Sequence, residues 1–130
     1  MRGDLFDFHL ERIATDDELA DALRQVFNVT FVRLVEEITS PGDFADVQVL
    51  VVRWVTGGDF PLHVSVHPQS ETFDQEEALA QRLCGVLACR CLISDDSPTP
   101  FSWRLVDSTA TRAVAVAPDR LDLDELVLRC

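Results

Sequence analysis

A chain of 130 residues that carries 23 acidic and 11 basic side chains has a formal net charge of -12 and a pI near 4.4. Such a charge repels the phosphates of nucleic acids and of anionic lipids and attracts basic proteins, so we expect a protein partner and neither nucleic acid nor membrane. The length fits one domain over residues 1–130, no apolar run is long enough to cross a bilayer, and the first residues lack the pattern of a secretory signal, which together predict a cytoplasmic protein.

The first forty residues predict a strand, a helix and a second strand. Leu5–Ile13 alternates apolar and polar side chains, as a half-buried strand does. Thr15 and Glu18 have the spacing of a capping box, and an apolar stripe follows at helical spacing: Leu19, Ala22, Leu23, Val26 and Phe27. Val29–Ile38 is rich in β-branched and aromatic residues and predicts a strand that ends before Ser40.

The clearest local signal is a β-hairpin within Asp43–Pro68. In an extended Val47–Val55, the side chains that point to one face and those that point to the other are both mainly apolar. This pattern is typical of a strand at the centre of a sheet. Thr56–Asp59 contains two glycines and suits a turn, and the chain returns through Leu62–Val66. We therefore expect the rest of the sheet to be built outward from this hairpin.

The second half of the chain predicts a helix followed by another hairpin. Residues 73–92 keep helical spacing, with Thr72 and Gln75 placed as a second capping box. After a proline-rich loop, Phe101–Leu105 and Ala113–Ala117 predict two paired strands. Leu121–Leu128 fits either a short helix or an alternating strand, because so short a run does not separate the two periods.

The predicted fold class is α+β. The order is β-α-β-β-β-α-β-β with a short C-terminal element, and hairpins dominate, so the sheet should be mainly antiparallel with two principal helices packed on one face.

The histidines and cysteines invite a metal interpretation that spacing argues against. His63 and His67 point to the polar side of one strand with Cα atoms ~13 Å apart, too far to share an ion, and His9 is expected on another polar face. The three cysteines near the end of the long helix do not offer tetrahedral geometry on one helix and are expected as buried, reduced thiols: Cys84, Cys89 and Cys91. No metal or other cofactor is therefore predicted.

Recognised catalytic motifs are missing from the sequence. It contains no phosphate-binding glycine loop, dinucleotide fingerprint, H-E-x-x-H helix or nucleophile elbow. The sequence therefore favours a protein that is not an enzyme. The enzyme alternative is a histidine and a carboxylate that line a pocket in the sheet.

Candidate partner-binding residues are the acidic clusters. They lie at the predicted start of the first helix, in the proline-rich loop and near the C-terminus: Asp16, Asp17, Glu18 and Asp21; Asp95 and Asp96; and Asp119, Asp122, Asp124 and Glu125. Exposed loops and helix ends are common places for partner contacts, and carboxylates there suit a basic partner.

Two protein families resemble this chain. Cys91–Val106, CLISDDSPTPFSWRLV, with Val114–Leu123 after it, resembles the C-terminal half of small bacterial immunity-type proteins encoded beside polymorphic toxins. That resemblance implies a cytoplasmic, non-catalytic inhibitor that binds a cognate toxin directly, as a monomer or homodimer. The acidic charge would suit a basic toxin domain.

Size, acidity and element order also resemble class I type III secretion chaperones. That resemblance implies a stable homodimer that binds an extended segment of an effector protein.

Overall fold

The computed structural model describes residues 6–37, 42, 47–68, 75–95, 98, 101–121 and 125–128. Its elements follow in chain order: β1 (Phe6–Leu10), α1 (Asp16–Phe27), β2 (Val32–Val35), β3 (Val49–Val55), β4 (Leu62–Pro68), α2 (Glu76–Leu87), β5 (Cys91–Ser94), β6 (Ser102–Val106), β7 (Thr111–Ala115) and α3 (Pro118–Leu121).

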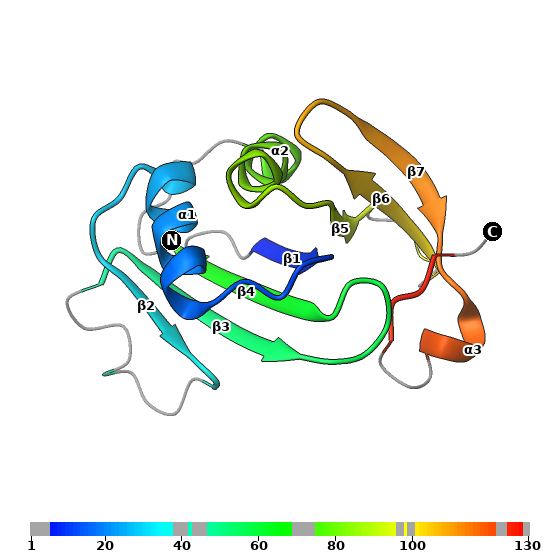
Figure 1. Cartoon of the computed structure of the whole chain (residues 1–130), viewed down its shortest axis with the longest axis horizontal. Helices are drawn as coiled ribbons and strands as arrows, with labels where there is room; N and C mark the ends of the chain where they lie inside the picture. The colour runs from blue at the N-terminus through cyan, green and yellow to red at the C-terminus, as the bar shows by residue number, and fades with distance from the viewer. Residues whose placement is uncertain are drawn as a thin grey trace.

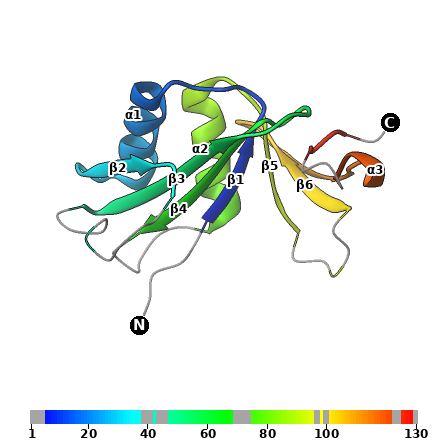
Figure 2. The ribbon, with the colours of Figure 1, turned by 90° about the horizontal axis from the view of Figure 1, so that it is seen from below.

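A seven-stranded sheet carries the two long helices on one face. The strand order is β2-β3-β4-β1-β5-β6-β7, and every neighbouring pair is antiparallel except the parallel pair β2 and β3. Figures 1 and 2 show α1 and α2 side by side over the same face of the sheet. The predicted α+β class, with a mainly antiparallel sheet and two principal helices on one face, is confirmed.

Local signals account for α1. The Thr15 hydroxyl accepts from the Glu18 amide at 3.2 Å, and the Glu18 carboxylate accepts from the Thr15 amide at 3.0 Å, so the predicted capping box forms. The apolar stripe of the helix is buried throughout. It packs on Phe8, Val51 and other residues of the facing strands in one continuous core.

The central strand of the sheet is β1, which corrects one expectation. β3 is flanked on both sides, by β2 and β4, but it is second in the order, and β1 is fourth of seven. The predicted hairpin itself is confirmed, because β3 and β4 pair from Val49 with Pro68 to Val55 with Leu62. A hairpin forms between segments that are close in the sequence, so local signals predict it. Its place in the sheet depends on the pairing of β1 with β4, which are far apart in the sequence.

The second helix is shorter than its predicted span of residues 73–92. α2 ends at Leu87, and Ala88 takes the left-handed conformation at φ 54°, with its N–H bonded to the Cys84 carbonyl. The chain then forms β5, whose first residues lie within the span that the sequence predicts as helix. β5 lies between β1 and β6, so its apolar side chains are buried on both faces. Thr72, half of the predicted second capping box, lies outside the described residues, and Gln75 makes no side-chain cap bond.

The opposite face of the sheet is closed in part by two non-strand segments. Phe60, from the turn between β3 and β4, packs with Leu92, Leu105, Val116 and Leu126 in a second cluster. Gly58 is required in that turn, since its φ is 89° and a Cβ would lie 2.9 Å from the backbone of Leu126.

The C-terminal part joins this closure through isolated bridges. Leu126 bridges Gly58, and Leu128 bridges Val116. The predicted element Leu121–Leu128 overlaps the short helix α3 only at Leu121, and its described residues Leu126 and Leu128 form isolated bridges instead of a regular helix or strand. The predicted second hairpin is confirmed as β6 and β7.

Candidate binding notch at the sheet edge

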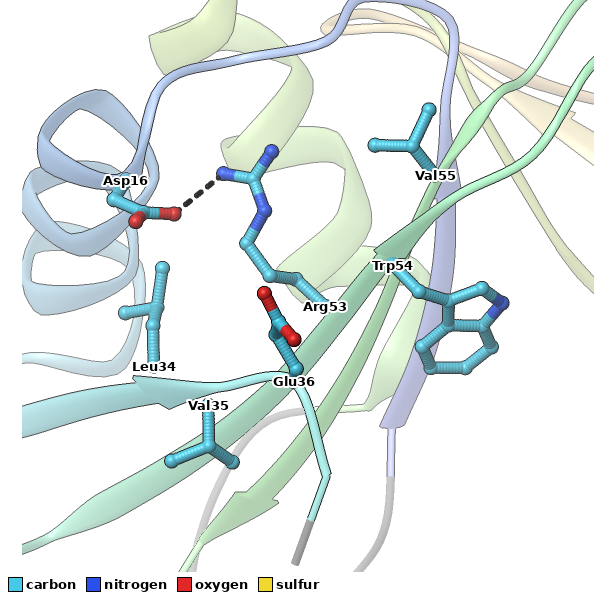
Figure 3. Close-up of a pocket in the computed structure, with 7 residues that line it drawn as sticks. All are labelled: Asp16, Leu34, Val35, Glu36, Arg53, Trp54 and Val55. Atoms are coloured by element: carbon cyan, nitrogen blue, oxygen red, sulfur yellow. Dashed lines mark hydrogen bonds and ion pairs between the residues drawn. The ribbon is translucent and has the colours of Figure 1, made fainter.

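The edge of the sheet is stepped because β2 is shorter than β3. The last pair between them joins Val35 to Val52, and β3 continues for three further residues to Val55. A hollow of about 630 Å³ lies at this step. We call it the edge notch, and its lining residues, drawn in Figure 3, are Asp16, Leu34, Val35, Glu36, Arg53, Trp54 and Val55.

An ion pair joins the first turn of α1 to β3 beside the edge notch. Arg53 donates from Nη1 to the Asp16 carboxylate at 2.9 Å and to the Ala14 carbonyl at 2.9 Å. The Arg53 side chain is only 16% exposed, whereas Asp16 faces solvent. Figure 3 shows Arg53 reaching toward Asp16, and Glu36 lines the same hollow. Asp16, Glu36 and Arg53 all line the hollow, so the formal charge of these three side chains together is negative.

Large apolar side chains are exposed at the same step. Trp54 is 41% exposed and Val55 is 52% exposed. The sequence predicts a strand that is apolar and buried on both faces, and this is wrong for its last residues, because β2 ends before it flanks them and Trp54 lies on the face away from the helices. Figure 3 shows Trp54 and Val35 pointing to the side of the sheet away from Arg53, so the edge notch offers carboxylates on one side and apolar surface on the other.

One of the predicted acidic clusters borders the edge notch. Asp16, Asp17 and Glu18 form the first turn of α1, and Asp16 lines the hollow. Glu18 accepts hydrogen bonds from the Thr15 amide and from Arg12, and these contacts lower the pKa of its carboxyl. Asp21 pairs with Arg24 at 2.6 Å. Of this cluster, Asp16 is the member that lines the hollow.

The other predicted clusters lie elsewhere or outside the described residues. Asp95 follows the end of β5, where the Ser102 hydroxyl donates a hydrogen bond to it. Asp119 is exposed in α3. Glu125 is half-buried against Gly57. Asp96, Asp122 and Asp124 lie outside the described residues. The predicted acidic residues that are described do not form one surface.

The histidines are arranged differently from the sequence prediction. His9 is the register partner of His63, and their ring centroids lie 4.3 Å apart, so His9 is on the same face as His63 and not on a separate one. Trp54 lies 5.3 Å from the His63 ring, and Trp103 lies 5.2 Å from the His9 ring. These four rings form a row across the face opposite the helices.

The four side chains of the ring row pack against one another. Burial, and secondarily the neighbouring His63, lower the pKa of His9 from 6.5 to about 3, so His9 is uncharged at neutral pH. Within the described residues the His9 Nδ1 atom is buried without a hydrogen-bond partner. The Thr56 hydroxyl lies 3.2 Å from His63 Nε2. The His9 ring is therefore held between the rings of His63 and Trp103.

The cysteines are confirmed as buried at two positions but not on a shared helix. Cys84 is in α2 and Cys91 is in β5, and both face the core between the helices and the sheet. Cys89, between them, is half-buried. Burial raises the pKa of the Cys89 and Cys91 thiols, which keeps them protonated at neutral pH. In the part of the chain that the structure describes, no three His, Cys, Asp or Glu side chains are grouped to hold a metal.

Comparisons with known proteins found no match. No protein-family model matches the chain, and neither a curated protein nor a solved structure is significantly similar to it. None of the described helices combines the length and the apolar character needed to cross a membrane.

Proposed function

We propose that this chain is a non-catalytic protein-binding domain of the immunity type, which neutralises a basic toxin by binding it through the edge notch. The observation that carries the proposal is the exposure of Trp54 and Val55 beside the Asp16 and Glu36 carboxylates in one hollow. Exposed tryptophans in partly enclosed sites are typical anchors of protein interfaces, and carboxylates around them select a basic partner.

The charge of the whole chain supports the same class of partner. A net charge of -12 accelerates the approach of a basic protein and opposes the approach of nucleic acid or of an acidic protein. A toxin that binds nucleic acid must itself present a basic surface, so an acidic inhibitor can compete for that surface. The resemblance of Cys91–Val106 to immunity-type proteins gives the biological setting of the proposal.

The test is a complex with the product of the neighbouring gene. We expect a one-to-one complex in light scattering after gel filtration, and we expect co-expression of this chain to restore the growth of cells that make the neighbouring product. The affinity should fall as salt is raised, because the attraction is electrostatic. No complex and no restored growth would refute the proposal. A stable homodimer bound to an extended effector segment would instead support the secretion chaperone.

A further inference from the structure

The final residues of β3 have backbone groups that face the edge notch. The Val49 amide donates to the Phe31 carbonyl at 3.2 Å on the β2 side, and the Thr56 amide donates to the Pro61 carbonyl at 2.8 Å on the β4 side. Backbone groups of successive strand residues point to opposite edges, so the odd-numbered residues of β3 direct their N–H and C=O toward β2. β2 ends opposite Val52, and Val55 therefore points its backbone donor and acceptor into the hollow.

We infer that the edge notch accepts an extended segment of the basic partner as an added strand beside β3. This rests on the proposed function and names its mode of contact: main-chain hydrogen bonds to Val55 provide affinity, and side chains on the two faces of the segment provide selectivity. Within the described residues no hydrogen bond from another residue occupies the outward backbone groups of Val55.

The two sides of the edge notch select an alternating segment. A strand places successive side chains on opposite faces. On the helix side of the sheet they meet the Asp16 and Glu36 carboxylates, and on the other side they meet Trp54 and Val35. A segment that alternates arginine with an aliphatic residue satisfies both sides at once.

A second copy of this chain is a poorer occupant of the edge notch. A two-fold contact would bring the same patch of both copies together, and the Asp16 and Glu36 carboxylates would then face one another. Charged residues at a short edge strand are a usual defence against such self-pairing. The charge therefore points to a partner of the opposite sign.

The inference is tested with a synthetic peptide that alternates arginine and valine, titrated into isotope-labelled protein and followed by NMR. We expect the largest chemical-shift changes at Trp54 and Val55 and slower hydrogen exchange at the Val55 amide. Glu36→Lys should weaken binding about tenfold, whereas Glu37→Lys, the same charge change at an exposed neighbour that does not line the hollow, should have a smaller effect. A peptide with N-methyl groups on alternate amides should not bind.

The outcomes separate this inference from the proposed function. Equal binding of the N-methylated peptide, or shifts centred on another surface, would overturn strand addition while a complex with the neighbouring gene product still stood. Absence of peptide binding would also overturn strand addition. Failure of the complex with the neighbouring product is a separate measurement, and it would refute the proposed function.

Discussion

The helix-covered face of the sheet and the edge notch contain similar apolar residues, but these residues are buried on the covered face and exposed at the edge notch. Under α1 and α2 the strand side chains that point toward the helices pack in one core with the helix side chains. Phe8, Leu10 and Val51 are fully buried there. At the edge notch, the same kind of strand continues past its neighbour, and Trp54 and Val55 remain exposed next to carboxylates. The difference lies in strand length, since β2 stops at Val35. The covered face should therefore carry stability, and the edge notch should carry recognition.

The largest expected effect is on stability and comes from the covered face. Phe8→Ala removes a fully buried ring from the central strand and should lower the free energy of unfolding by about 3–5 kcal/mol. Trp54→Ala removes a larger ring, but that ring is 41% exposed, so the substitution should cost clearly less. Urea unfolding monitored by circular dichroism measures both variants. Equal losses would show that the edge notch is part of the stabilising core.

A smaller loss of stability is expected at acid pH, because His9 of the ring row is buried. The folded-state pKa of His9 is about 3, below its ordinary 6.5, so the unfolded chain takes up a proton that the folded chain does not. The stability that neutral His9 maintains is present above pH 6.5 and is lost as pH falls toward 3, by ~1.4 kcal/mol for each pH unit at most. Burial also lowers the pKa of His67, although Asp7 opposes the shift, and its effect has the same sign.

Urea unfolding at pH 7 and pH 5 should show this loss in the native chain and a smaller one in His9→Gln. The carboxyls with lowered pKa, such as Glu11, begin to contribute only near their ordinary value of 4.5, so they add little in this interval. An unchanged pH slope in His9→Gln would mean that another group causes the loss.

Local elements could be predicted from the sequence because their signals lie within a few residues. The capping box of Thr15 and Glu18 and the β3–β4 hairpin form as expected. Elements that depend on distant pairing could not be predicted. β5 continues the apolar pattern of α2 and becomes visible as a strand only because Cys91 pairs with Leu10 and with Val106.

The same limit explains what was missed at the candidate site. The acidic side of the site could be predicted, because Asp16 lies in the first turn of a helix that the sequence identifies and a first turn is exposed. The exposure of Trp54 could not, because an apolar strand does not reveal where its neighbour ends. Nor does spacing along the chain show that His9 faces His63, which requires the register between β1 and β4.

The central claim, that the edge notch is the binding surface, is tested most directly by two matched charge reversals measured against the cognate partner. Glu36→Lys changes a lining residue of the edge notch, and Asp119→Lys makes the same charge change at an exposed residue of α3. Calorimetric titration should show an affinity at least about tenfold lower for Glu36→Lys and nearly native affinity for Asp119→Lys. Native affinity in Glu36→Lys together with a loss in Asp119→Lys would contradict the account and place the interface at the C-terminal acidic cluster.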